Sequence, residues 1–209
     1  MSFIQEGSTI LFQGDSITDV GRNRDDIMNL GMGYPMMVHS WLAAMHPEKK
    51  VRIINKGIGG DKTGMLLGRW QEDALDLKPD VISILIGIND TWRRYDSNDP
   101  TSVETFESNY RKILEMTRNE TDALVVLMEP FVLPVPEDRN TWREDLDPKI
   151  QVVRKLAREF GTLFVPLDGI FAAASMLRDP GFWAPDGVHP SNPGHALIAR
   201  SWLQTMKVL

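Results

Sequence analysis

The sequence contains no cysteine among its 209 residues. Disulfide bonds, thiolate metal sites and cysteine nucleophiles are therefore excluded. A cysteine-free chain fits a reducing compartment. Residues 1–6 show neither the basic nor the apolar segment of a signal peptide, so we expect a cytoplasmic protein.

An excess of basic residues is also missing. The chain has 23 Lys and Arg against 29 Asp and Glu, which gives a net charge of −6. No strong positive field would attract phosphates, so we expect no nucleic-acid partner. Nor does any apolar run approach the roughly 18 residues that span a bilayer, so we expect no membrane partner. The length suits one domain, residues 1–209.

What the sequence does have is short apolar runs that alternate with longer amphipathic segments. The predicted strands are residues 8–13, 51–55, 81–86, 124–128 and 163–166. The predicted helices are residues 34–45, 63–77, 103–118, 148–160 and 192–206. Nearly continuous apolar strands are typical of parallel strands covered on both faces. The alternation predicts an α/β fold, a three-layer α/β/α sandwich with a flavodoxin-like parallel five-stranded sheet of order 2-1-3-4-5.

Such a sheet binds ligands at the carboxyl ends of its strands, where the strand order reverses. Unusual segments follow the predicted strands at that edge. They are "GDS" at 14–16, "NKGIGGDKT" at 55–63, "GINDTWRRYD" at 87–96, the long loop 129–145 and "WAPDGVHPSNPGH" at 183–195. We expect them to converge and to form the functional site.

One of the four histidines stands out in this set. His189 follows Asp186 by three residues, with Gly187 between them. A turn there would let the Asp186 carboxylate reach Nδ1 of His189 and leave Nε2 free to act as a base. A serine hydroxyl needs such a base to become a nucleophile, which makes Ser16 the candidate partner.

Acyl transfer also needs hydrogen-bond donors for an oxyanion. The glycines 59–60 can supply a backbone N–H, Asn89 can supply a side-chain amide, and Ser16 can supply its own N–H. Each motif alone also has a structural interpretation: Ser16 as a helix cap, the glycines as a permissive turn and Asn89 as a cap. The joint occurrence at successive strand ends favours catalysis.

Other functions compete with an esterase. "GIGGDKT" is unlike a phosphate-binding loop because Asp61 stands where that motif needs glycine before the lysine. A metallohydrolase with Asp15, Asn89, Asp186 and His189 around a divalent ion is a second alternative, and insensitivity to EDTA would exclude it. A non-catalytic flavodoxin-like module that binds a carbohydrate or a partner is a third.

Four blocks of the sequence resemble those of the SGNH (GDSL) hydrolase family. They are "GDSIT" at 14–18, "NKGIGGDKT" at 55–63, "GIND" at 87–90 and "DGVHP" at 186–190. The resemblance implies a flavodoxin-like esterase that hydrolyses carboxylic esters with no metal and no other cofactor.

The resemblance also implies a role for each matched residue. Ser16 matches the family nucleophile, and Asp186 and His189 match its Asp-x-x-His pair. Gly60 matches the backbone donor of the oxyanion hole, and Asn89 matches the side-chain donor.

A finer resemblance concerns the substrate. "GINDTWRRYD" and "ITDVGRNR" are similar to segments of bacterial carbohydrate acetylesterases of the acetyl-xylan esterase type. This implies acetyl esters of sugars as small-molecule substrates, with a broad lipolytic, aryl or thioester esterase as the alternative. We expect Trp92, Arg93, Tyr95 and Trp183 to bind substrate. The alternatives are that the tryptophans pack in the core and that Arg93 pairs with a local acid.

The loop 129–145 raises one further expectation. Pro134 and Pro136 suggest a semi-rigid flap, and Phe131 and Trp142 are expected to be exposed on it. Exposed aromatic residues would favour a homo-oligomer.

Overall fold

Five parallel strands form a single sheet in the order β2-β1-β3-β4-β5. The computed structural model describes residues 2–209. The strands are β1 (Thr9–Gly14), β2 (Arg52–Asn55), β3 (Val81–Leu85), β4 (Leu124–Met128) and β5 (Leu163–Val165). The observed order confirms the predicted sheet. The chain leaves β1 for β2 on one side and returns to β3 on the other, so the strand order reverses at β1.

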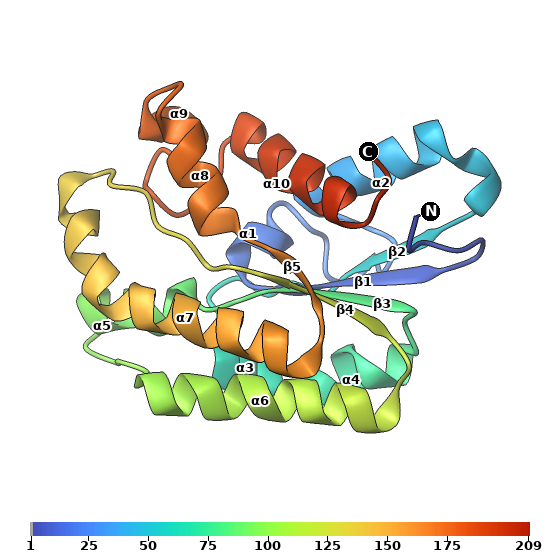
Figure 1. Cartoon of the computed structure of the whole chain (residues 1–209), viewed down its shortest axis with the longest axis horizontal. Helices are drawn as coiled ribbons and strands as arrows, with labels where there is room; N and C mark the ends of the chain where they lie inside the picture. The colour runs from blue at the N-terminus through green and yellow to red at the C-terminus, as the bar shows by residue number, and fades with distance from the viewer. Residues whose placement is uncertain (1) are drawn as a thin grey trace.

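Helices cover both faces of this sheet (Figure 1). One face carries α2 (Tyr34–Met45), α8 (Leu167–Ser175) and α10 (Asn192–Thr205), with α1 (Ser16–Asp19) and α9 (Pro180–Trp183) on the same side. The other face carries α3 (Thr63–Gly68), α4 (Trp70–Asp73), α6 (Val103–Glu120) and α7 (Arg143–Phe160). The remaining elements are α5 (Ile88–Asp96) and the 3₁₀ turns η1 (Pro47–Lys49), η2 (Leu75–Leu77) and η3 (Glu137–Trp142).

The core has two parts, one on each face of the sheet. In β1, Ile10 and Phe12 belong to the cluster under α2 and α10, whereas Leu11 belongs to the cluster over α3, α4 and α6. Successive side chains of a strand point to opposite faces, and both faces are buried here. This is why the strand sequences are continuously apolar.

Several helices differ from their predicted bounds. Helix α7 begins at Arg143 rather than at Pro148, which lies inside it. Proline costs a helix one backbone hydrogen bond, and burial of Leu146 and Ile150 on the core compensates for that loss. The predicted helix over residues 63–77 is divided into α3, α4 and η2. The segment after β3 is the helix α5 rather than a loop.

The expectation of exposed aromatic residues on the loop 129–145 is wrong. Phe131 and Trp142 are 0% and 2% exposed. The ring of Phe131 stacks on Phe171 at 4.2 Å between centroids, and Trp142 stacks on Tyr95 at 5.2 Å. The loop folds back onto α8 and α5, so these rings stabilise the monomer and give no support for self-association.

Within residues 2–209, the helices lack the combination of length and apolar character that a membrane crossing requires.

Candidate active site

The turn after β1 presents Ser16 at the carboxyl edge of the sheet. A Cβ on Gly14 would stand 2.3 Å from the hydroxyl oxygen of Thr18 and 2.4 Å from the carbonyl oxygen of Leu85. Glycine therefore allows the turn to pack against β3. The helix cap is Asp15, whose Oδ1 accepts the N–H of Ile17 at 3.0 Å. The interpretation of Ser16 as the capping residue is wrong, and its hydroxyl is free for another partner.

That partner is His189, 173 residues away along the chain. The hydroxyl oxygen of Ser16 lies 2.9 Å from Nε2 of His189. Nδ1 of the same ring lies 2.6 Å from Oδ2 of Asp186. The other oxygen of Asp186 accepts the N–H groups of Val188 and His189 at 3.0 and 2.7 Å. The structure thus brings together the three residues that the sequence places in a relay.

The short segment between Asp186 and His189 depends on Gly187. Its φ is +81°, a conformation that residues with a Cβ rarely adopt. A Cβ there would also stand 2.3 Å from the carbonyl oxygen of Val135 and 2.6 Å from that of Leu133. The N–H of Leu133 in turn donates to the carbonyl of Gly187 at 2.8 Å. The loop 129–145 therefore holds the turn that carries the base.

The pKa values of the pair are displaced in opposite directions. Burial disfavours the Asp186 carboxylate, but hydrogen bonds from the side chain and backbone of His189 and from Val188 outweigh burial and lower its pKa to about 2. The hydrogen bond to Asp186 raises the pKa of His189 above its ordinary value, against the opposing effect of burial. Asp186 is therefore anionic at neutral pH, and it stabilises the protonated imidazole.

The glycine turn that contains Gly60 packs beside Ser16. Ser16 Cβ is 3.8 Å from the point where a Cβ on Gly59 would stand, so the glycine turn is adjacent to the serine. In the described part of the chain, the N–H groups of Ser16 and Gly60 donate to no other group. Gly60 has a φ of +89°. Both N–H groups are available to a ligand oxygen.

The third predicted donor, Asn89, lies in the first turn of the helix α5, which follows β3. Its side chain is buried, and its Nδ2 donates to the carbonyl of Asp61 at 3.1 Å. Asp61 ends the turn that contains Gly60, because its N–H donates to the carbonyl of Ile58 at 3.2 Å. The amide of Asn89 has a second N–H that this bond does not use. Asn89 and the glycine turn are therefore one connected unit.

The four residues predicted to bind substrate have different surroundings. Trp92 is half-buried, and its ring lies 5.5 Å from the imidazole of His189 and 5.4 Å from Trp142. Arg93 pairs with Asp96 and also donates to Oδ1 of Asn89 at 3.3 Å. Trp92 therefore lies next to the candidate base. Arg93 pairs with a nearby acid, as its alternative interpretation predicted.

Tyr95 and Trp183 make contacts within the protein. The Tyr95 hydroxyl donates to the carbonyl of Thr141 at 3.0 Å. Nε1 of Trp183 donates to the carbonyl of Ala174 at 3.2 Å, and its ring packs against the core. These contacts fix η3 and α8. A substrate contact for either residue stays a prediction.

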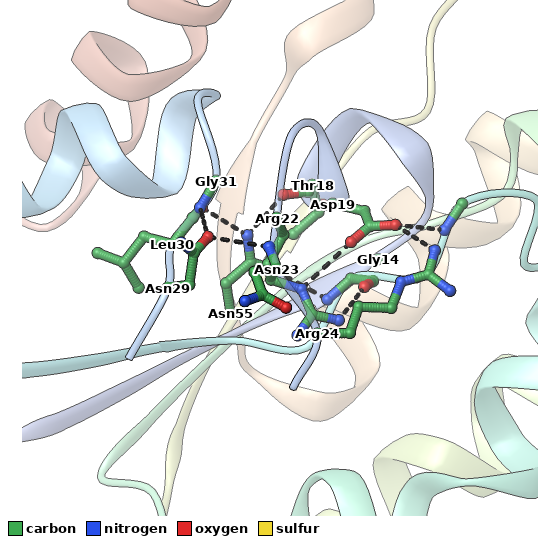
Figure 2. A network of polar contacts seen from close by, with 12 residues as sticks. Gly14, Thr18, Asp19, Arg22, Asn23, Arg24, Asn29, Leu30, Gly31 and Asn55 are labelled. Carbon is green, nitrogen blue, oxygen red and sulfur yellow. Dashed lines mark hydrogen bonds and ion pairs between the residues drawn. The ribbon is translucent and has the colours of Figure 1, made fainter. Parts of the chain in front are cut away.

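Sequence reasoning missed the surroundings of Asp15 and Asp19. Asp15 is buried, its Oδ2 has no hydrogen-bond partner, and burial raises its pKa to about 7. Asp19 pairs with Arg22 and Arg24 (Figure 2). The segment "ITDVGRNR" contains all three charged residues of this network, but nothing in its spacing indicates which groups pair.

The metallohydrolase alternative requires several ligating side chains around one point. Across residues 2–209, no three His, Asp or Glu side chains are grouped closely enough to share a metal ion. Oδ1 of Asp15 instead caps α1, and both oxygens of Asp186 accept hydrogen bonds from its own loop.

Comparison with known proteins places the chain among ester hydrolases. A family model for GDSL-like lipases and acylhydrolases matches residues 12–197. An acetylxylan esterase of Geobacillus stearothermophilus is 38% identical over 208 residues, which covers 96% of this chain and 94% of that protein. An arylesterase of Vibrio mimicus is 27% identical over 177 residues, covering 82% and 80%.

The solved structures agree with this assignment. The crystal structure of Axe2, an acetylxylan esterase from Geobacillus stearothermophilus, matches with a TM-score of 0.88 and 36% identity, covering 97% of this chain and 95% of that one. The family-model match includes the glycine turn and the Asp-x-x-His segment. The chain therefore belongs to the GDSL-like lipase/acylhydrolase family and is a carboxylic ester hydrolase.

Proposed function

We propose that this protein is a serine esterase that removes acetyl groups from carbohydrates through an acyl-enzyme. The observation that carries the proposal is the relay from Ser16 through His189 to Asp186, with contacts of 2.9 and 2.6 Å. A hydroxyl in contact with an imidazole whose other nitrogen is held by a carboxylate is the arrangement that activates a serine.

In the acylation step, the Ser16 oxygen attacks the ester carbonyl while Nε2 of His189 takes its proton. The N–H groups of Ser16 and Gly60 and the amide of Asn89 stabilise the oxyanion. His189 then donates its proton to the leaving alcohol. Asp186 keeps the imidazole in position and stabilises its charged form without accepting the proton.

In the deacylation step, a water molecule replaces the alcohol. His189 takes a proton from this water, which attacks the acyl carbonyl, and the same donors stabilise the second oxyanion. The acid is released when His189 returns the proton to Ser16. No metal ion or other cofactor has a role in either step.

The substrate class rests on likeness and on one structural feature. The acetylxylan esterase of Geobacillus stearothermophilus matches along nearly the whole chain. Trp92 borders His189, with the guanidinium groups of Arg93 and Arg139 at 5.6 and 5.5 Å from its ring centre. An aromatic face flanked by donors suits a sugar better than a long acyl chain. Aryl esters are a second candidate, because the Vibrio mimicus arylesterase also matches.

The test compares acetylated xylo-oligosaccharides with p-nitrophenyl esters of increasing acyl length, using the wild-type protein and Ser16→Ala. We expect the wild type to prefer acetyl esters and to react with a fluorophosphonate probe, and we expect Ser16→Ala to lose both activities. Retention of most activity in Ser16→Ala would exclude Ser16 as the nucleophile. Absence of both activities in the wild type would favour the non-catalytic binding module.

A cytoplasmic location belongs to the same proposal, whereas the oligomeric state is left to measurement because the buried rings of Phe131 and Trp142 do not favour self-association. Cell fractionation tests the first and light scattering of the purified chain tests the second.

A further inference from the structure

The turn that carries the Gly60 N–H has two glycines at its tip. It runs from Ile58 to Asp61, closed by the hydrogen bond from the Asp61 N–H to the Ile58 carbonyl at 3.2 Å. Its third residue, Gly60, has a φ of +89°, which identifies a type II turn. Type I and type II turns differ by a reversal of the central peptide, to which the Gly60 N–H belongs. A change of turn type would therefore point this N–H away from the acyl oxygen.

Two glycines leave the turn without side chains to hold it. Of the polar backbone groups of Gly59 and Gly60, only the Gly59 N–H bonds to another group within residues 2–209. Its acceptor is Oδ2 of Asp19, at 3.0 Å. Glycine adopts many backbone conformations at little cost. This one bond is consequently the main restraint on the tip of the turn.

Asp19 is itself fixed by two arginines. Nε of Arg22 donates to Oδ1 at 3.2 Å, and Nη2 of Arg24 donates to Oδ2 at 2.5 Å (Figure 2). Arg22 also donates to the carbonyl of Gly57 at 2.7 Å, one residue before the turn. The side chain of Arg22 is 4% exposed and that of Arg24 is 52% exposed. The segment 19–22 after β1 is therefore joined by two hydrogen bonds to the segment 57–59 after β2.

The charge state of Asp19 suits this role. Burial disfavours its carboxylate, but the hydrogen bonds from Arg24 and from the Gly59 N–H outweigh burial and hold its pKa below the ordinary value. The carboxylate is therefore anionic throughout the pH range in which His189 can act as a base. A bond from a backbone N–H to a charged acceptor is stronger than one to a neutral acceptor.

We propose that Asp19 is a positioning residue that holds the Ile58–Asp61 turn in its type II form, so that the Gly60 N–H points at the reacting acyl oxygen. This inference rests on the proposed esterase function. Asp19 acts through Gly60 and does not touch the substrate. Its contribution is made to the transition state, where the oxyanion develops, rather than to the bound ester.

Asp19→Asn tests this role because it keeps the shape of the side chain and removes its charge. We expect kcat to fall about 10- to 100-fold. This is less than the ~10²- to 10³-fold fall in kcat that follows complete removal of an oxyanion donor. We expect KM to change by less than about threefold, because ground-state binding does not use the oxyanion. The inhibition constant of an arylboronic acid, which forms a tetrahedral adduct, should rise in parallel with the fall in kcat/KM.

The matched control is Glu107→Gln. Glu107 on α6 also accepts from two cations, Arg111 at 3.1 Å and Lys155 at 2.7 Å. Glu107→Gln should leave kcat within about twofold of the wild type, because these partly buried ion pairs lie on α6, away from the candidate site. A fall in kcat equal to that of Asp19→Asn would show a general effect of removing charge and would overturn the proposal.

A double-mutant cycle that combines Asp19→Asn with Gly60→Ala tests whether Asp19 acts through Gly60. A Cβ on Gly60 would meet no protein atom within 4 Å. Alanine there should therefore disturb the turn only because residues with a Cβ disfavour a positive φ. We expect Gly60→Ala to lower kcat by itself and to make Asp19→Asn nearly silent, because both changes release the same peptide. Multiplicative losses, or a loss confined to KM, would refute a role through Gly60.

Two further outcomes are distinguishable. If the wild type has no esterase activity, the proposed function fails; if it is active and Asp19→Asn keeps its kcat, only this inference fails. Should Asp19→Asn not fold, Arg24→Gln removes the exposed arginine of the network and still tests the proposal. It should lower kcat by about threefold or more with KM unchanged, and full activity would overturn the proposal.

Discussion

Replacing Asp15 with asparagine should remove a large part of the pH dependence of the free energy of unfolding. Asp15 is 1% exposed, and its Oδ2 has no hydrogen-bond partner. Burial raises its pKa from 3.8 to about 7. The Ile17 N–H and the charge of His189 favour the carboxylate, whereas the charges of Asp90 and Asp61 oppose it. Burial dominates, so the folded protein keeps a proton that the unfolded chain releases.

The sign and size of the effect follow from proton linkage. Between pH 3.8 and about 7 the folded state binds more protons than the unfolded state, so stability falls as the pH rises. The gap between the two pKa values corresponds to about 4 kcal/mol at 1.36 kcal/mol for each pH unit. About 3 kcal/mol of this is lost between about pH 5 and about pH 9.

The assay is urea unfolding of the wild type and Asp15→Asn at several pH values in that range. Asparagine keeps an acceptor for the Ile17 N–H but buries an amide without a partner, which costs about 1–3 kcal/mol at every pH. The measured quantity is therefore the change with pH and not the stability at one pH. Asp25→Asn, at an exposed carboxylate, controls for the loss of charge. If the free energy of unfolding changes with pH equally in Asp15→Asn and in the wild type, the reasoning is refuted.

Three other outcomes are expected. Asp186→Asn should lower kcat by up to about 10⁴-fold and move the acid limb of the pH–rate profile to lower pH, because the bond to Asp186 raises the pKa of His189; an unmoved limb would contradict this pairing. Gly187→Ala should lower the unfolding temperature more than Gly161→Ala. Both positions have positive φ, but only at Gly187 would a Cβ clash with the Val135 carbonyl. Equal decreases in unfolding temperature would show that the loop 129–145 moves to relieve this clash. EDTA should leave the rate unchanged, and a loss restored by a divalent cation would favour metal-dependent hydrolysis.

Much of the site could be predicted because each motif follows its own strand. Parallel strands bring their carboxyl ends to one edge, so Ser16, Gly60 and Asn89 had to converge once the strand order was known. Helix boundaries were harder. The helix α7 continues through Pro148 because contacts on the core outweigh the local cost of proline. Rules that consider only neighbouring residues in the sequence do not include the stabilisation from these core contacts.

The environment of the carboxylates could not be predicted. Asp15 and Asp19 lie four residues apart on either side of Ser16, yet burial raises the pKa of the first and hydrogen bonds lower that of the second. Their sequence neighbours do not distinguish them. Asp19 differs because Arg24 and the Gly59 N–H reach it, and Gly59 lies on another strand end.

The sequence by itself determined the parallel sheet, its strand order and the family, because continuous apolar runs and motifs at strand ends are local properties of the chain. Only the tertiary structure decided which atoms meet. Packing sets the 2.9 Å contact between Ser16 and His189, the assignment of the helix cap to Asp15 and the bond from Asp19 to the glycine turn. Burial and charge at a group sum over neighbours that are distant in the sequence, so they exist only once the chain has folded.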